Sequence, residues 1–359
     1  MNRLILIGNG FDLAHGLKTS VKDFAIYYFT KVFNQIISGK SYEDELVSFK
    51  LDTFKYIPFF DNSITSSSFF DLKRNIDSND AIKKTFHSDI LYLLYKSLGN
   101  FNWFNIEEVY FKNLVQHTNP MIKEEVIEVN NLFDKLKEVF IEYLKLENDK
   151  INNELFNKNI YQSFISKGDP LPELYQLERN ELLGDIMFLN FNYTDSVNQY
   201  LKKIQSDYQA NMIHIHGSID EKYGSPVFGY GDEFNKKYLS FEEMNNNELF
   251  RHIKSFYYSL NSNYYRLTSY IDYSEFEVHI YGHSCGITDR TLLNQIFEHE
   301  NCKSIKVFYH ERSDGTNDFV DKSYEIARHF KNKQMFRKRL VPLEFSSPMP
   351  QINDEKSKI

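Results

Sequence analysis

The pattern of apolar and polar residues changes near residue 180 of the chain. After that point, short apolar runs bounded by turn residues predict strands. These runs cover residues 185–191, 212–217, 225–231, 277–284 and 304–310. A further apolar run, "NRLILIG" at 2–8, predicts a buried strand near the first residue.

Segments with the apolar spacing of helices separate these strands. They cover residues 20–36, 247–271, 290–299 and 322–332. Strands that alternate with helices usually form a parallel sheet with helices on both faces. The sequence therefore predicts an α/β fold with a Rossmann-like parallel sheet, to which the first strand and the last third of the chain both contribute.

The middle of the chain has a different pattern, in which helical spacing and polar loops predominate. Its clearest amphipathic helix covers 130–156. We therefore expect a discontinuous sheet domain at 1–35 and 180–345, with a large helical insertion at 36–179 after the first strand and helix. The segment 346–359 contains two prolines and mixed charge, so we expect it to be a disordered tail.

Composition limits the partners that the protein can have. With 359 residues, 42% of them hydrophobic, the chain can bury a sizeable core. Its net charge of −8 disfavours nucleic acid as a partner, and we interpret the basic stretch 331–339 as a solvated helix face. The two cysteines, Cys285 and Cys302, suit a reducing cytoplasm. Since no run approaches the roughly 18 apolar residues of a membrane span, we expect a cytoplasmic protein without a membrane partner.

The first predicted strand leads into a pair of glycines. Gly8 and Gly10 flank Asn9, and Asp12 follows where a helix is predicted to begin. A strand, a glycine turn and a helix N-terminus together form a common binding site for phosphate groups. The match to the dinucleotide-binding pattern is partial, because Leu13 occupies the place of its third glycine. A tight turn with Asp12 as the helix N-cap is the structural alternative.

Polar residues and glycines also follow the later strands. They are Asn192, His216, Gly217, Gly229, Gly282, Ser284 and Asp289. In open α/β sheets, ligands bind beyond the carboxyl ends of the strands. These residues and the opening turn are therefore the candidate binding residues for a small molecule.

Five motifs follow one another along the chain. They read "LIGNGFDLAHGL", "WFNIEEVY", "FNYT", "HIHG" and "YGHS". Together they resemble the motifs of the AbiH abortive-infection family of bacterial anti-phage proteins. In the second motif Trp103 and Glu107 fit the family pattern, whereas Asn105 replaces its usual aspartate. The resemblance implies a role in phage defence, with a phage trigger that the sequence does not identify.

The same series is similar to the sirtuin-like NAD-binding fold. The turn at 8–12 corresponds to the glycine turn of sirtuins, and Asn192 corresponds to an asparagine of their central motif. His216 and Gly217 correspond to their catalytic histidine and the glycine after it. The other residues that match sirtuin motifs are Phe228, Gly229, Gly282 and Ser284.

This second resemblance implies binding and hydrolysis of NAD⁺. Sirtuin deacylases carry a zinc ribbon with two Cys-x-x-Cys pairs, and this chain has neither pair. Nicotinamide leaves NAD⁺ as a neutral molecule, so its release needs less acid assistance than cleavage of an ordinary glycosidic bond. His216 would accept a proton, and Asn192 would position the ribose or a water molecule. The residues implied to bind the nucleotide are Gly8, Asn9, Gly10, Asp12, Gly217, Gly229, Gly282, Ser284 and Asp289.

Two alternatives and the oligomeric state stay open. A nucleotide-sensing module would bind NAD or an ADP-ribose derivative at the same turn without cleaving it. A serine hydrolase would use Ser284, because "GHSCG" at 282–286 matches the nucleophile elbow and lies between a predicted strand and helix. His310 would then be the base. A homo-oligomer is compatible with the sequence.

We expect no metal requirement, because His214 and His216 have no acidic cluster with ligand spacing near them in sequence. NAD⁺ cleavage by the purified protein should therefore be unchanged by a strong chelator. Metal analysis and nicotinamide release, measured before and after treatment with EDTA, check this expectation. Stoichiometric zinc or manganese whose removal abolishes cleavage would contradict it.

Overall fold

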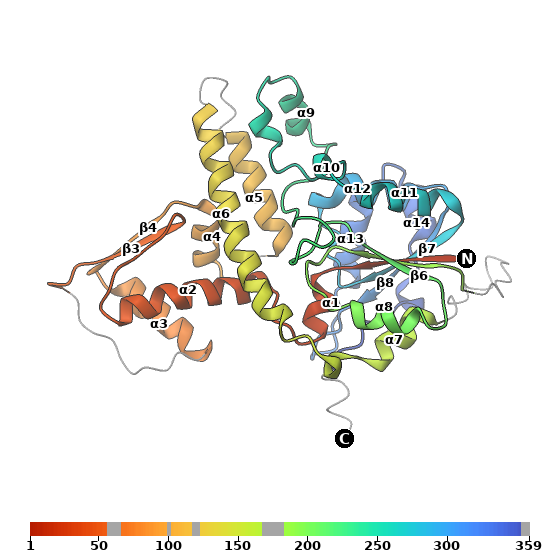
Figure 1. Ribbon diagram of the computed structural model, residues 1–359, viewed down its shortest axis with the longest axis horizontal. Helices are drawn as coiled ribbons and strands as arrows, with labels where there is room; N and C mark the ends of the chain where they lie inside the picture. The colour runs from red at the N-terminus through yellow and green to blue at the C-terminus, as the bar shows by residue number, and fades with distance from the viewer. Residues whose placement is uncertain (56–65, 99–101, 117–122, 167–182, 353–359) are drawn as a thin grey trace. The chain divides into compact units, whose positions relative to one another are not determined.

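The structure is a computed structural model, and it shows two compact units (Figure 1). The described residues are 1–55, 66–98, 102–116, 123–166 and 183–352. One unit, here called the sheet unit, comprises Met1–Lys18, Leu144–Asn245 and His252–Ile359. The other, here called the insertion unit, comprises Thr19–Tyr143 and Asn246–Arg251.

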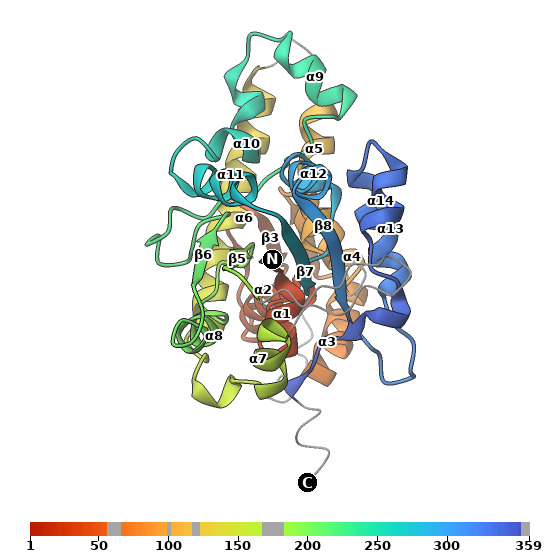
Figure 2. The same ribbon diagram turned by 90° about the vertical axis from the view of Figure 1, so that its right-hand side faces the viewer.

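The sheet unit contains a six-stranded sheet in which all neighbouring strands are parallel. Its strands are β1 (Asn2–Ile7), β5 (Ile186–Asn190), β6 (Ala210–His214), β7 (Phe276–Tyr281), β8 (Cys302–Tyr309) and β9 (Ser347–Pro348). Their order is β6-β5-β1-β7-β8-β9, and Figure 2 shows the central strands side by side. The chain adds strands outward from β1 to β6, and then returns to add β7 on the other side of β1. The strand order therefore reverses between β1 and β7, and the prediction of a parallel α/β sheet is confirmed.

The register aligns the carboxyl ends of four neighbouring strands, β6, β5, β1 and β7. Ile7 pairs with Asn190 on one side and with Tyr281 on the other. Asn190 in turn pairs with His214. Since these four residues end or nearly end their strands, the segments that follow β1, β5, β6 and β7 meet at one edge of the sheet.

Helices cover both faces of the sheet. In β1, Leu4 and Leu6 belong to one buried cluster, and Ile5 and Ile7 belong to a second, because successive side chains of a strand point to opposite faces. The first cluster is completed by α11 (Asn263–Tyr273), α12 (Arg290–Glu298) and α13 (Phe319–His329), and the second by α7 (Lys158–Ile165) and α8 (Asn198–Ile204). Figure 1 shows α11 and α12 across the strands from α7 and α8. The other helices of this unit are α1 (Asn9–Ala14), η1 (Asn153–Leu155), α9 (Lys236–Glu242), α10 (Lys254–Tyr257), η4 (Ile287–Asp289), α14 (Lys333–Arg339) and η5 (Leu343–Phe345).

The insertion unit combines helices with a small antiparallel sheet. The helices are α2 (Val21–Ile37), α3 (Ser66–Ser78), α4 (Asp89–Lys96), α5 (Trp103–Gln116), η3 (Asn247–Phe250) and most of α6 (Lys123–Asn148). The strands are β2 (Tyr42–Glu43), β3 (Val47–Leu51) and β4 (Ile82–Phe86), in that order. The sequence predicted a helical insertion and did not reveal these three strands. Their runs are too short and too polar to be distinguished from loops by pattern alone.

The insertion unit also differs in its bounds from the predicted 36–179. Helix α2 belongs to it because the aromatic side chains of the helix pack there; the ring centroids of Phe24 and Phe140 are 5.6 Å apart. The segment Leu144–Asn245 belongs to the sheet unit, since α7 contributes Phe164 to its core. Hydrophobic spacing reveals a helix but not the core against which the helix packs.

Two predicted elements after residue 220 have a different structure. The segment 225–231 is not a strand of the sheet and makes an isolated parallel bridge from Tyr230 to Ile253. The segment 247–271 is divided into η3, α10 and α11 instead of forming one helix. A polar turn before α11, in which Asn261 Oδ1 accepts a hydrogen bond from the following helix, interrupts it.

The predicted disordered tail at 346–359 differs in its first part. Ser347 and Pro348 form β9, and Ser347 pairs with Phe308 of β8. Proline is tolerated there because β9 is the edge strand of the sheet. Residues 353–359 lie outside the described residues.

Glycines allow the loops after β1 and β7 to touch. A Cβ on Gly8 would lie 2.4 Å from the Cα of His283, and one on Gly10 would lie 2.7 Å from the Cα of Gly282. A Cβ on Gly282 would lie 2.1 Å from the backbone nitrogen of Phe11. The contact between these loops therefore requires the glycines, whether or not a ligand binds beside them.

We expect Gly282→Ala to lower the free energy of unfolding by more than Gly315→Ala. The two glycines have φ of 68° and 81°, so both substitutions carry a backbone cost of about 1–2 kcal/mol. A Cβ at Gly315 would meet no described atom within 4 Å, so that variant is the matched control. Urea denaturation measures both losses. Equal losses would show that the contact between the loops contributes nothing.

Candidate functional site

The predicted site residues gather into two clusters at the carboxyl edge of the sheet. The Asp12 cluster comprises Asp12, Asn192, Thr194 and Ser196, and the Asp289 cluster comprises His216, Lys254, His283 and Asp289. Each of these eight residues is at most 7% exposed. Asn9, the first residue of α1, lies half-buried at the same edge. Because buried polar groups are costly unless they are paired, their contacts define what each cluster can do.

The Asp12 cluster joins α1 to the loop after β5. The Asp12 carboxylate accepts hydrogen bonds from Thr194 Oγ1 at 2.7 Å and from Ser196 Oγ at 2.5 Å. Asn192 Nδ2 donates to the carbonyl oxygen of Gly8 at 3.1 Å. Burial raises the pKa of Asp12 to about 6, although the hydroxyl bonds favour its ionised form. Asp12 is not the helix N-cap, which is Gly8, and its oxygens already have partners within the fold.

Three side chains converge on the carboxylate of Asp289. Lys254 Nζ donates to Oδ1 at 2.8 Å. His216 Nε2 lies 3.3 Å from the same oxygen, although not in the geometry of a well-directed hydrogen bond. His283 Nε2 lies 3.6 Å from Oδ2. The ring of Phe191 packs against both imidazoles, with centroids 5.2 Å from His216 and 4.0 Å from His283.

These contacts determine the charges of the cluster. Burial opposes ionisation of Asp289, but the Lys254 ammonium and the two imidazoles outweigh it and hold the pKa of Asp289 well below its usual value. Burial, and then the charge of Lys254, lowers the pKa of His216. Burial lowers the pKa of His283 as well. At neutral pH the cluster therefore combines a carboxylate, an ammonium and two neutral imidazoles.

The loop after β7 fixes the orientation of His283. The backbone N–H of Cys285 donates to His283 Nδ1 at 3.0 Å, so the proton of the neutral ring is on Nε2 and faces Asp289. Cys285 has a φ of 54°, which is rare for a residue with a side chain. Its carbonyl oxygen accepts a hydrogen bond from His329 Nε2 at 2.8 Å. Strained backbone held in this way is frequent at functional sites.

The candidate residues named from the sequence do not include Thr194, Ser196, His283 or Lys254, and Lys254 is the charged residue among these four. The predicted helix 247–271 gives no reason to bury a lysine, whereas the structure places Lys254 where it is 1% exposed. One signal was available: Lys254 is the single Asp, Glu, Lys or Arg residue between positions 252 and 260. A lone lysine in a largely apolar run is a candidate for a buried ion pair.

Gly229 positions Lys254. A Cβ on Gly229 would lie 2.0 Å from the carbonyl oxygen of His252, so glycine is needed for the two segments to touch. The backbone of Tyr230 bonds to both ends of the segment 252–254. Its carbonyl oxygen accepts a hydrogen bond from Lys254 N, and its N–H donates to His252 O, each at 2.9 Å. Gly217 has a packing role too, since its φ is 76° and a Cβ there would lie 2.3 Å from a carbonyl oxygen.

The turn around Ser284 does not have the geometry of a nucleophile elbow. The strained residue in the turn is Cys285, whereas in an elbow it is the nucleophile. Ser284 Oγ accepts a hydrogen bond from Gly286 N at 3.3 Å. His310, the base of the serine-hydrolase alternative, is exposed and bonds to Asp318 through its backbone nitrogen. These contacts do not favour that alternative.

His214 does not join the Asp289 cluster. Its Nδ1 lies 3.3 Å from Asn190 Nδ2, its ring stacks on Tyr223 with centroids 4.4 Å apart, and burial lowers its pKa to about 4. Across the described ranges, no group of three or more His, Cys, Asp or Glu side chains is arranged to hold a metal ion. In those same ranges, no helix has the length and apolar character needed to cross a membrane.

The motif around Trp103 lies in the insertion unit, at the start of α5. Trp103 Nε1 donates to the carbonyl oxygen of Thr19 at 2.9 Å. Asn105 Oδ1 accepts a hydrogen bond from the backbone N–H of Asn102 at 2.9 Å, as the side chain at position N3 of a capping box does. Asparagine offers the same acceptor as the aspartate that it replaces. Glu107, the third residue of the motif pattern, is buried.

Comparison with known proteins gives a family match over most of the chain. Residues 4–311 match the family described as Bacteriophage abortive infection AbiH. The match extends from β1 to just beyond β8, so it includes both clusters and the insertion unit. No curated protein matches the chain.

The free energy of unfolding should decrease as the pH is lowered from 7 to 5. Burial lowers the pKa values of His15, His214 and His329 to about 4. These groups stay neutral in the folded chain but bind protons in the unfolded chain below a pH of about 6.5, so their stabilisation is complete above that pH and is lost as the pH falls toward 4. Asp12, whose pKa is raised, acts in the opposite direction, but it is one group against three.

Urea denaturation at the two pH values measures this effect. His329→Gln should reduce the pH dependence, because it removes one of the three buried imidazoles. The exposed His310→Gln is the control and should leave the dependence unchanged. A protein that is equally stable at both pH values, or more stable at pH 5, would contradict the analysis.

Proposed function

Because the chain belongs to the AbiH family of bacteriophage abortive-infection proteins, we propose that it acts in phage defence by binding a nicotinamide adenine nucleotide and hydrolysing NAD⁺. The strand order supports a Rossmann-like, nucleotide-binding assignment. It is the order of dinucleotide-binding domains, in which the ligand crosses the carboxyl edge where the order reverses. Here that reversal lies between β1 and β7, and the loops after both strands carry candidate residues.

The buried Asp289 cluster is the observation that carries this proposal. Removing a carboxylate and an ammonium from water is costly, and apolar residues of similar volume often stabilise a fold as well. Titratable groups with shifted pKa values, gathered where strands end, are typical of catalytic sites. The cluster also contains His216, which the sequence resemblance to sirtuins implies to be the catalytic histidine.

The proposed reaction is hydrolysis of the bond between nicotinamide and ribose. The carbon–nitrogen bond breaks and its electron pair leaves with neutral nicotinamide, while a water oxygen bonds to the ribose carbon. His216 accepts the proton of that water through Nδ1, the nitrogen that does not face Asp289, and later releases the proton to solvent. The products are nicotinamide, ADP-ribose and a proton, so atoms and charges balance.

The other members of the cluster would act through His216. A neutral imidazole is needed to accept a proton, and both burial and the Lys254 charge keep the pKa of His216 low. Once His216 is protonated, the Asp289 carboxylate 3.3 Å away stabilises the imidazolium. Lys254 keeps Asp289 ionised, and His283 contacts its second oxygen. Asp289, Lys254 and His283 are therefore positioning residues in this proposal.

Asn192 is a candidate site residue, and it also has a structural role. Its amide nitrogen bonds to the Gly8 carbonyl oxygen, which joins the loops after β1 and β5. Substitution of Asn192 should therefore reduce stability as well as any cleavage. The side chain of His216 has no such bond to the backbone of another loop among the hydrogen bonds of the described residues, so His216 is the better residue for a test of catalysis.

We predict that His216→Ala releases nicotinamide from NAD⁺ at a rate about 10²–10⁴-fold below that of the unmodified protein, the usual effect of losing a general base. His310→Ala, a substitution of an exposed histidine after β8, is the matched control and should keep the full rate. Mass spectrometry of the products measures the rates, and circular dichroism checks that both variants are folded. Growth arrest in cells should follow the same order.

Three outcomes would contradict this function. If the unmodified protein binds NAD⁺ by calorimetry but releases no nicotinamide, the nucleotide-sensing alternative replaces it. If folded His216→Ala keeps the full rate, the Asp289 cluster is not the catalytic site. If cleavage depends instead on Ser284 and is blocked by a fluorophosphonate, the serine-hydrolase alternative is correct.

A further inference from the structure

The turn after β7, residues 282–286, contains two residues in the left-handed region. Gly282 has a φ of 68° and Cys285 has a φ of 54°. Glycine adopts such angles freely, whereas a residue with a Cβ adopts them at a cost. The Cys285 side chain is 0% exposed and belongs to the first buried cluster of the sheet unit, so a glycine there would leave a gap in that cluster. The turn therefore needs contacts that hold Cys285 in this conformation.

Helix α13 supplies two such contacts. Lys322 Nζ donates a hydrogen bond to the carbonyl oxygen of His283 at 2.8 Å. His329 Nε2 donates a hydrogen bond to the carbonyl oxygen of Cys285, also at 2.8 Å. The two donors are seven positions apart, which is about two turns, so they lie on the same face of the helix. One face of α13 therefore bonds to two carbonyl groups of the turn.

The His329 ring makes its hydrogen bond to this turn alone among the described residues. It is 1% exposed, and burial lowers its pKa to about 4, so the ring is neutral and carries its single proton on Nε2. Its Nδ1 is buried and makes no hydrogen bond with any described residue. A buried nitrogen without a partner is costly, and an apolar side chain would pack there without that cost. The bond to Cys285 is therefore what a histidine adds at this position.

The loop after β1 holds the other end of the turn. Gly10 N donates to the carbonyl oxygen of Gly282 at 2.9 Å, and Gly8 N donates to that of Tyr281 at 3.0 Å. With the two bonds from α13, the carbonyl groups at 281, 282, 283 and 285 all accept hydrogen bonds from outside the turn. These bonds hold the backbone of the turn from both ends.

The conformation of the turn decides what the His283 ring can do. Cys285 N donates to His283 Nδ1, and the ring proton is on Nε2, which faces Asp289. In this form neither ring nitrogen has a lone pair to spare, because Nδ1 accepts one hydrogen bond and Nε2 carries the proton. His283 can therefore donate a hydrogen bond but cannot accept a proton, and His216 is left as the imidazole of the cluster that can.

We propose that α13 positions the Asp289 cluster through Lys322 and His329. Their bonds to the turn keep Cys285 in the left-handed conformation, which in turn holds His283 in its Nε2–H form. Without these bonds the turn relaxes, the Cys285 N–H leaves Nδ1, and the His283 ring can carry its proton on Nδ1 instead. The consequence for catalysis rests on the proposed function, because His283 belongs to the same site.

Nitrogen-15 NMR of His283, in the isotope-labelled full chain, tests this proposal because it distinguishes a ring nitrogen that carries a proton from one that does not. His329→Leu and Lys322→Met each remove one donor and keep a side chain of similar size. Each should raise the ratio of the Nδ1–H form to the Nε2–H form by about two- to tenfold, the change in an equilibrium constant that corresponds to losing one hydrogen bond. Lys322 is half-buried, so Lys322→Met keeps the test valid if His329→Leu does not fold.

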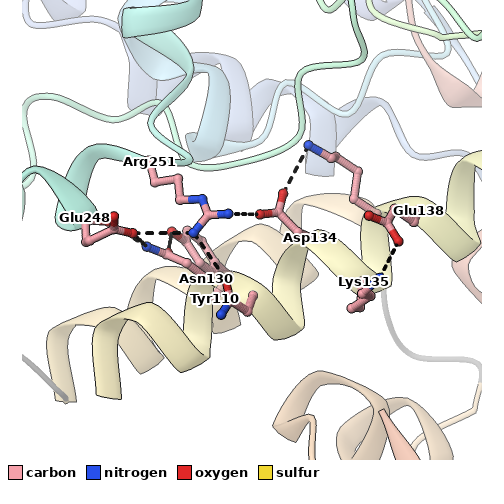
Figure 3. A network of polar contacts seen from close by, with 9 residues as sticks. Tyr110, Asn130, Asp134, Lys135, Glu138, Glu248 and Arg251 are labelled. Atoms are coloured by element: carbon pink, nitrogen blue, oxygen red, sulfur yellow. Dashed lines mark hydrogen bonds and ion pairs between the residues drawn. The ribbon is translucent and has the colours of Figure 1, made fainter. Parts of the chain in front are cut away.

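Two further variants and one control complete the experiment. His329→Gln and Lys322→Arg keep a donor in place, so they should show the ratio of the unmodified protein. Tyr110→Phe is the matched control, because it also removes one hydrogen bond of a buried side chain, from the Tyr110 hydroxyl to Asn130 Oδ1 at 2.8 Å, but in the insertion unit (Figure 3). It should lower the free energy of unfolding without changing the ratio.

Three results would overturn the proposal. The first is an unchanged ratio in folded His329→Leu or in Lys322→Met. The second is a ratio in His329→Gln and Lys322→Arg that changes as much as in the variants without a donor. The third is the same change in Tyr110→Phe, which would trace the effect to a general loss of stability.

Nicotinamide release by the same variants separates this proposal from the proposed function. A changed ratio together with slower release in His329→Leu and Lys322→Met supports both. A changed ratio in a protein that releases no nicotinamide even when unmodified supports the positioning role and overturns NAD⁺ hydrolysis. A changed ratio with full release overturns the catalytic part of this proposal and leaves hydrolysis in place.

Discussion

The buried ion pair between Lys254 and Asp289 is the interaction on which the rest of the site depends. A carboxylate at the carboxyl edge of the sheet stays ionised only if a cation accompanies it, and removing one partner of such a pair typically costs about 3–5 kcal/mol. Several backbone features bring that cation into place. Gly229 and Gly231 let the segment around Tyr230 approach His252 and Thr288 more closely than any side chain would permit.

The two clusters at the carboxyl edge of the sheet differ in how their side chains contact one another. In the Asp12 cluster, side-chain oxygens and amides are bonded to one another and join the loops after β1 and β5. In the Asp289 cluster, charges and neutral imidazoles face each other across longer distances, and the strained turn at Cys285 presents His283. The first arrangement is suited to holding a shape, and the second is suited to moving a proton. The chain that carries both clusters belongs to the AbiH family of bacteriophage abortive-infection proteins.

Much of the sheet could be predicted from the sequence, because parallel strands buried on both faces appear as uninterrupted apolar runs. The runs at β1 and β5 were largely of that kind, whereas β7 and β8 place polar residues such as Glu277, His279 and Lys306 within their apolar pattern. The position of His216 at a strand end also followed from the sequence. Its contact with Asp289 did not, since the two residues are 73 positions apart (289 − 216) and only the folded turn joins them.

Other parts depend on packing that local patterns do not record. A Cβ on Gly8 or Gly10 would clash with the neighbouring loop, so the need for glycine in this turn has a cause other than the predicted approach of a phosphate. Lys254 was hidden inside a predicted helix that the structure divides into η3, α10 and α11.

The most direct test of the account is the titration of His216, followed by NMR in the isotope-labelled full chain with and without ADP-ribose. The account predicts a pKa below the usual 6.5 in the free protein and a signal that shifts when ADP-ribose binds. A His216 that titrates at or above 6.5 and does not respond to ADP-ribose would contradict it.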